Sequence, residues 1–276
     1  MPENLTINTE ITLNNGLNMP LFGLGTYQAH GREVEKAVRA ALDEGYRLID
    51  TAAMYGNEEE VGKAIRESGI AREDIFVTTK LWNSDHGYDN ALNAFEDSLT
   101  NLDIGYIDLF LIHWPVEGLR KETWRAFEEL YSGEKLKAIG VSNYLIRHMK
   151  DLLEIAQVPP TVNQVEFSPF LYQKELLEYC RENDMRLEAY SPLTKGRKLD
   201  DPKLISIAEN YDKSVAQILI RWSLQHEIIT IPKSSRAERI QENARVFDFE
   251  ISDEDMKKMD SMNEDLHTAW NPSSVS

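Results

Sequence analysis

Short apolar runs alternate with longer amphipathic runs along most of the chain. The clearest, Leu109–Ile112, is apolar throughout, as is typical of parallel strands that are covered by helices on both faces. We predict eight such strands, at Leu21–Leu24, Arg47–Asp50, Ile75–Lys80, Ile107–His113, Leu136–Ser142, Val162–Glu166, Arg186–Tyr190 and Ile228–Ile231.

The intervals between these strands carry apolar residues at helical spacing, for example Val34, Ala37, Val38 and Ala41. We predict helices at Gly31–Asp43, Glu58–Glu67, Asn90–Leu102, Glu122–Ser132, Ile146–Ala156, Lys174–Glu182, Ser214–Gln225, Ala237–Ala244 and Asp253–Met262, with an inserted helix at Pro202–Tyr211. Ser252 is expected to cap the helix at Asp253–Met262, whose first turn is acidic.

A hairpin is predicted before the first of these strands. Ile11–Leu13 and Leu17–Met19 are separated by Asn14, Asn15 and Gly16, and an Asn-Gly pair supplies the positive φ that a tight turn needs.

Eight repeated strand–helix units predict a closed (β/α)8 TIM barrel, in the α/β class, rather than an open doubly wound sheet. The chain has no linker-like composition shift, so we predict that residues 1–276 form a single domain, with an N-terminal β-hairpin and extra C-terminal helices.

The chain is acidic, with 47 acidic and 30 basic residues and a formal charge of −17. Such a surface repels nucleic acid and anionic membranes, so we expect neither as a partner. No apolar run reaches the ~20 residues of a membrane span, and no signal-peptide pattern begins the chain. One cysteine, Cys180, excludes an internal disulfide and suggests a packed thiol in a cytoplasmic protein. We expect a monomer.

In a β/α barrel the C-terminal ends of the strands face the active site. Asp50, Lys80 and His113 end three consecutive predicted strands, and Tyr55 follows the first of them. A lysine beside a tyrosine lowers the phenol pKa, an aspartate holds that lysine, and a histidine can orient a substrate oxygen. Each residue alone is commonly structural, but together they suit protonation of a carbonyl oxygen as a hydride arrives.

A basic segment follows the last predicted strand and opens a helix, which is the usual phosphate position in such barrels. Lys233, Arg236 and Arg239 place positive charge there in an otherwise acidic chain. Beside a hydride-transfer site, this charge suggests the extra phosphate of NADP(H). The chain has no G-x-G-x-x-G fingerprint, and its six histidines form no metal-binding pair, so we expect neither a Rossmann site nor a metal.

These motifs resemble those of the aldo-keto reductases, NADPH-dependent barrel oxidoreductases, and in particular their bacterial aldehyde, diketo-gluconate and glyoxal reductase-like branch. The resemblance runs from Ile11 to Ser252. It is carried by Phe22–Thr26, Gly45–Ala52, Tyr55–Glu58, Thr79–Trp82, Asp108–Pro115, Ile139–Asn143 and Ile231–Ser234.

The resemblance implies NADPH-dependent reduction of small reactive aldehydes and ketones, such as glyoxal and methylglyoxal, with keto-sugars as further candidates. Tyr55 would be the general acid, Lys80 and Asp50 would tune its pKa, and His113 would orient the substrate. NADPH/NADP+ would be held by Ser142, Asn143, Gln164, Tyr190, Ser191, Leu193, Lys233, Ser234, Arg239, Glu242 and Asn243. Tyr27, Met54, Trp82, His113 and Trp114 would form the substrate pocket, which the short segment from His113 to Lys121 predicts to be open.

Two other functions remain open at this point. A glycosidase-like barrel would use strand-end carboxylates such as Asp50 and Glu166 as an acid–base pair. A regulatory subunit would bind the nicotinamide cofactor without turnover.

Overall fold

The computed structural model describes residues 5–133 and 135–275. Its main sheet has eight parallel strands in chain order. They are β3 (Leu24–Gly25), β4 (Leu48–Asp50), β5 (Phe76–Leu81), β6 (Ile107–Ile112), β7 (Leu136–Ser142), β8 (Val162–Glu166), β9 (Arg186–Tyr190) and β10 (Ile229–Thr230). Parallel bridges from Phe22 to Thr230 and from Gly25 to Lys233 join the two edges, which closes the predicted barrel.

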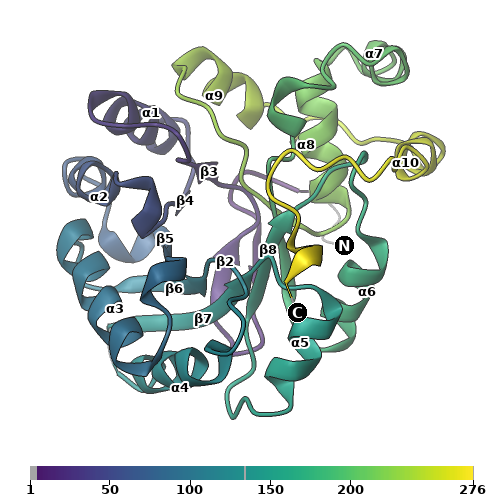
Figure 1. The fold of residues 1–276 in the computed structure, drawn as a ribbon. Helices are drawn as coiled ribbons and strands as arrows, with labels where there is room; N and C mark the ends of the chain where they lie inside the picture. The colour runs from purple at the N-terminus through teal and green to yellow at the C-terminus, as the bar shows by residue number, and fades with distance from the viewer. Residues whose placement is uncertain (1–4, 134, 276) are drawn as a thin grey trace.

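Helices surround the strands on the outside of the barrel (Figure 1). Between successive strands lie α1 (Arg32–Asp43), α2 (Glu58–Arg66), α3 (Tyr88–Leu102), α4 (Arg120–Tyr131), α5 (Ile146–Leu153), α6 (Lys174–Glu182) and α8 (Val215–Gln225), and α7 (Pro202–Glu209), α9 (Ala237–Ala244) and α10 (Asp253–Asp260) are additional. The predicted cap of α10 is confirmed, because the Ser252 hydroxyl accepts the N–H of Asp255. Helix ends differ from the prediction by up to three residues, as frayed ends commonly do.

The prediction for the first barrel strand was wrong in its bounds. Leu21–Leu24 was expected, but β3 covers only Leu24–Gly25. The residues before it lie along the seam of the barrel, where the Leu21 carbonyl accepts from Thr230 N–H at 2.9 Å and Gly23 N–H donates to Thr230 at 3.0 Å. An apolar run marks a buried segment but does not tell which neighbour its backbone bonds.

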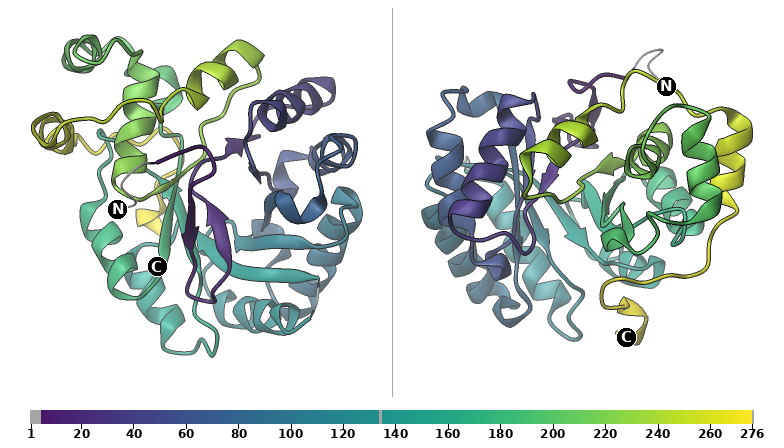
Figure 2. Two further views of the ribbon diagram at one scale, coloured as in Figure 1. Left: turned by 180° about the vertical axis from the view of Figure 1, so that it is seen from behind. Right: turned by 90° about the horizontal axis from the view of Figure 1, so that it is seen from above.

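The N-terminal hairpin closes one end of the barrel. Its strands β1 (Glu10–Thr12) and β2 (Asn18–Pro20) pair with Ile11 opposite Met19, within one residue of the predicted bounds. Asn15 donates to the Lys137 carbonyl at 3.0 Å, and Arg186 donates to the Thr12 carbonyl at 3.0 Å, so the hairpin lies over the N-terminal ends of β7 and β9. Seen from behind, it crosses that end of the barrel (Figure 2). The C-terminal ends of the strands are therefore the open end.

Cys180 belongs to the continuous apolar core, with no exposed surface. This burial confirms the predicted packed thiol, and it raises the pKa of the thiol to about 12. Within the described residues, no helix combines the length and apolarity that crossing a membrane requires.

Gly62 lets α2 approach the end of α3 closely. A Cβ at this position would lie 1.8 Å from the backbone oxygen of Leu102. We predict that Gly62→Ala lowers the free energy of unfolding by about 3 kcal/mol, because neither backbone can move away without disturbing the core. Urea denaturation measures the loss.

Lys63→Ala, one residue further along α2, is the matched control. It removes only an exposed ion pair with Glu35 and should cost about 0.5 kcal/mol. An equal effect of the two substitutions would contradict the close-approach argument.

Candidate active site

The turn after β4 is shaped by backbone geometry and one buried amide. Ala53–Tyr55 forms a single turn of 3-10 helix, which Gly56 ends at φ 60°. The Asn57 side chain accepts from the Thr51 hydroxyl at 2.6 Å and donates to the carbonyls of Thr26 and Ala29. Asn57 therefore ties this turn to the segment after β3 and fixes the position of Tyr55.

Lys80 and Asp50 form a buried ion pair, as predicted from their places at neighbouring strand ends. The ammonium group lies 2.7 Å from each carboxylate oxygen of Asp50 and 2.8 Å from the Thr51 carbonyl, and Lys80 has no exposed surface. All three ammonium protons thus have an acceptor, which is what permits a buried charge. Burial raises the pKa of Asp50, and the Lys80 charge opposes that rise.

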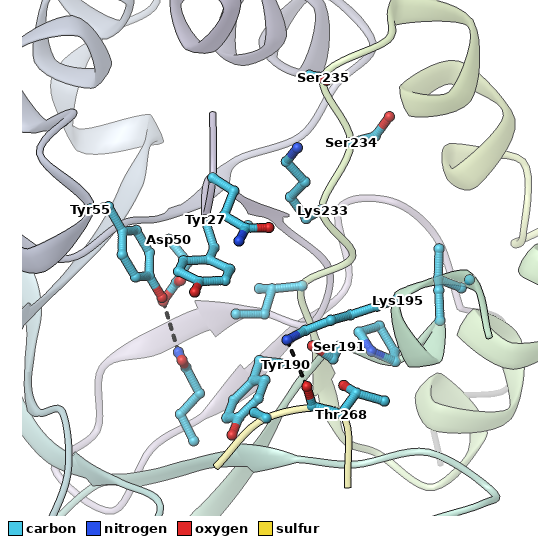
Figure 3. Close-up of a pocket in the computed structure, with 18 of the residues that line it drawn as sticks. Tyr27, Asp50, Tyr55, Tyr190, Ser191, Lys195, Lys233, Ser234, Ser235 and Thr268 are labelled. Atoms are coloured by element: carbon cyan, nitrogen blue, oxygen red, sulfur yellow. Dashed lines mark hydrogen bonds between the residues drawn. The ribbon is translucent and has the colours of Figure 1, made fainter. Parts of the chain in front are cut away.

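The pKa expected for Tyr55 was wrong in direction. Burial raises its pKa well above the ordinary value, and the Asp50 carboxylate acts the same way. The ammonium group of Lys80 lies 5.1 Å from the ring centroid of Tyr55 and donates its three hydrogen bonds to other acceptors. Tyr55 is therefore a neutral phenol at neutral pH, which is the form that can give a proton. Figure 3 shows Tyr55 and Asp50 side by side in the cavity.

His113 stands edge-on to two aromatic rings, with centroid distances of 5.8 Å to Tyr55 and 5.2 Å to Trp82. Burial, and then the Lys80 charge, lower its pKa well below the ordinary value, so the imidazole is neutral at neutral pH. Its Nδ1 is buried without a hydrogen-bond partner among the described residues. The Nε2 side is therefore the part of the ring that a substrate oxygen can reach.

A cavity of about 1140 Å³ opens at the C-terminal ends of the strands. Every predicted catalytic, cofactor and substrate residue lines it except Lys80, which lies beneath Asp50. Tyr27, Met54, Trp82 and Trp114 line the end that holds Tyr55, so the structure brings the predicted substrate walls together. The volume exceeds the ~300–1,000 Å³ usual for drug-sized ligands and suits a dinucleotide with a small substrate.

The other end of the cavity carries unpaired positive charge. Lys233, Arg236 and Arg239 line it, all three are exposed, and none forms an ion pair with the described residues. Arg236 precedes the first turn of α9, where the N–H groups of Ala237 and Glu238 have no acceptor within the helix. Because the chain carries a net charge of −17, unpaired cations lining a cavity indicate a site for an anion.

Several predicted cofactor residues are already bonded within the protein. Asn143 donates to the His113 carbonyl and to the Ser142 hydroxyl, each at 3.0 Å, and accepts from the Tyr190 hydroxyl at 2.8 Å. The Ser142 hydroxyl donates to the Gln164 carbonyl at 2.8 Å. A carbonyl-bearing ligand would have to exchange one of these bonds.

Comparisons with known proteins agree with this geometry. The family model of the Aldo/keto reductase family matches residues 21–264. The chain belongs to the aldo/keto reductase family. It is 53% identical over 263 residues to glyoxal reductase of Bacillus subtilis, covering 95% of each protein. It is 54% identical over 271 residues to the uncharacterized oxidoreductase YtbE of the same organism, covering 96% of this chain and 97% of that protein.

Solved structures place the fold in the same family. The crystal structure of MGS-M4, an aldo-keto reductase from a Medee basin deep-sea metagenome library, superposes with a TM-score of 0.94 at 48% identity, covering 97% of this chain and all of that one. The protein is therefore an aldo/keto reductase enzyme with a barrel fold.

The C-terminal tail supplies cavity residues that the sequence did not reveal. Trp270 packs against Trp114 with ring centroids 4.7 Å apart and ring planes inclined by 59°, and it remains half exposed. Lys195, after β9, donates to the Thr268 carbonyl at 2.8 Å and so joins the tail to the loop on the opposite rim (Figure 3). No periodicity in a short polar tail tells where it folds back.

Glu166 holds this tail in place. One carboxylate oxygen accepts from the Thr268 N–H at 2.8 Å and from the Thr268 hydroxyl, and the other accepts from Ala269 N–H at 3.1 Å. Glu166 is bound to the tail and Asp50 to Lys80, so neither of the two carboxylates considered for a glycosidase is free to act as its acid or base. Among the described residues, no group of acidic, histidine and cysteine side chains could hold a metal ion.

We predict that Lys80→Met lowers the free energy of unfolding by about 3–5 kcal/mol, because it leaves the Asp50 carboxylate buried without its cation. The double variant Asp50→Asn/Lys80→Met should lose less than the sum of the two single variants. Urea denaturation of the four proteins gives the coupling energy. Additivity within about 0.5 kcal/mol would show that the two groups do not depend on each other.

Proposed function

We propose that this aldo/keto reductase reduces small reactive aldehydes and ketones, such as glyoxal and methylglyoxal, with NADPH, and that keto-sugars are its larger candidate substrates. The observation that carries the proposal is one cavity with a proton-bearing tyrosine at one end and unpaired cations at the other. The 53% identity to glyoxal reductase supports the substrate class.

Tyr55 acts as the general acid in this proposal. Its raised pKa keeps the proton on the phenol at neutral pH, ready for the substrate oxygen, whose basicity rises as the carbonyl is reduced. The ammonium of Lys80, 5.1 Å from the ring, offsets part of the cost of the phenolate that remains, although burial and Asp50 keep the pKa of Tyr55 above its ordinary value. Neutral His113 donates a hydrogen bond that orients the carbonyl oxygen.

The residues at the other end fit NADPH better than NADH. Lys233, Ser234 and Arg239 would bind the 2′-phosphate, with Arg236 adding charge, and Glu242 and Asn243 would contact the adenine. Tyr190 would stack on the nicotinamide, and Ser191 and Leu193 would line the pyrophosphate. Bound NADPH supplies the hydride, and the aromatic walls at the Tyr55 end keep water away from the reacting carbon.

Tyr55→Phe tests the acid. We predict that turnover of methylglyoxal falls about 1000-fold, because a general acid contributes about 10²–10⁴ to the rate. The Kd for NADPH, measured by quenching of tryptophan fluorescence, should stay within about twofold. Loss of both turnover and binding would assign Tyr55 to structure rather than to chemistry.

Lys233→Ala/Arg239→Ala tests the phosphate end. We predict that the KM for NADPH rises about 100-fold while that for NADH changes less than about twofold, because charge-assisted hydrogen bonds are worth about 1.5–3 kcal/mol each and NADH lacks the 2′-phosphate. Initial rates of cofactor oxidation with methylglyoxal give both values.

Lys121→Ala/Lys150→Ala is the matched control, since it removes the same charge from exposed positions on α4 and α5. It should leave both constants unchanged. Equal use of NADPH and NADH by the parent protein would overturn the phosphate assignment and keep the chemistry.

A further inference from the structure

A second buried carboxyl group lies beside the ion pair. Glu188 is in the middle of β9, opposite Gln164 of β8, and has no exposed surface. It does not line the cavity and has no part in the mechanism above. A carboxyl group that is buried in a strand and has no cation as a direct partner requires a physical reason.

The Gln164 amide connects this group to the active site. Its Nε2 donates to Asp50 Oδ2 at 2.7 Å and to Glu188 Oε2 at 2.8 Å, so both of its protons are used. The orientation of the amide is fixed chemically, because the Asp50 carboxylate can only accept a hydrogen bond and would repel the side-chain oxygen Oε1 of Gln164. Gln164 lines the cavity, so Oε1 is the polar atom that it has left for a ligand.

We infer that Glu188 is a positioning residue for the cofactor: it takes the second N–H of Gln164, so that Gln164 presents only an acceptor to the carboxamide N–H of a nicotinamide. This inference rests on the proposed use of NADPH. Without an acceptor at position 188, the amide would keep its bond to Asp50 but could turn about it. Its free N–H would then face the N–H of the carboxamide.

The environment of Glu188 suits this role over the neutral pH range. Burial, and then the Asp50 charge, raise the pKa of Glu188 to about 8. A protonated carboxyl group still accepts through its carbonyl oxygen, so the hydrogen bond to Gln164 requires no second buried charge. The other oxygen, Oε1, has no hydrogen-bond partner among the described residues and can carry that proton.

Glu188→Met and Glu188→Gln distinguish the effect of the hydrogen-bond acceptor at position 188 from the effect of side-chain volume. Methionine fills a similar volume without an acceptor, whereas glutamine keeps a carbonyl oxygen for Gln164. The probes are NADP+ and its 3-acetylpyridine analogue, in which a methyl group replaces the carboxamide nitrogen and removes the N–H donor. Fluorescence titration gives the Kd of each protein for each probe.

We expect Glu188→Met to weaken NADP+ about tenfold and the acetylpyridine analogue less than twofold, since a single hydrogen bond is worth about that factor. Glu188→Gln should bind both probes within about twofold of the parent protein. The analogue should also bind the parent more weakly than NADP+ does, because it lacks the N–H donor.

Two results would overturn the inference: NADP+ binding that Glu188→Met leaves intact, or equal weakening of both probes, which indicates a general loss of structure. Glu188→Leu, which also lacks an acceptor, replaces the methionine variant if that variant does not fold. A parent protein that binds NADP+ and reduces methylglyoxal keeps the proposed function whatever the Glu188 variants do, so the two failures are distinguishable.

Discussion

The need to satisfy a fully buried ammonium group organises this end of the barrel. Lys80 has three protons and no access to water, and the neighbouring strand end meets that need with both oxygens of Asp50 and the carbonyl of Thr51. Asp50 is then oriented so that one oxygen also accepts from Gln164. A polar network thereby joins β4, β5 and β8 across the interior of the barrel.

Much of this could be predicted from the sequence, because parallel strands bring their carboxyl ends together whatever the details of packing. Asp50, Lys80 and His113 were found by that rule alone, and the basic segment after the last strand was found by its contrast with an acidic chain. Glu188 offered a signal that was not used, since it stands two residues before Tyr190 and so on the same face of its strand.

The features of the site that could not be predicted from the sequence depend on distances between side chains and on their loss of contact with water. The pKa of Tyr55 is raised because the phenol is buried and because the protons of Lys80 are all bonded to other acceptors. The types of neighbouring residues alone do not show which of these effects is larger. The seam at Leu21–Gly23 and the contact of Trp270 with Trp114 likewise join segments that are far apart in the sequence. Local patterns carry no information about such long-range contacts, which depend on the whole closed barrel.

Because Glu166 anchors the tail, the attachment of the tail to the barrel does not depend on which side chains the tail carries. The carboxylate accepts mainly from the backbone N–H groups of Thr268 and Ala269, and every amino acid except proline provides such a group. The side chain of Trp270 can therefore be exchanged while its attachment to the barrel persists. Substitutions at a few positions of the tail could therefore change the range of substrates during evolution, while the barrel and its polar network stay the same.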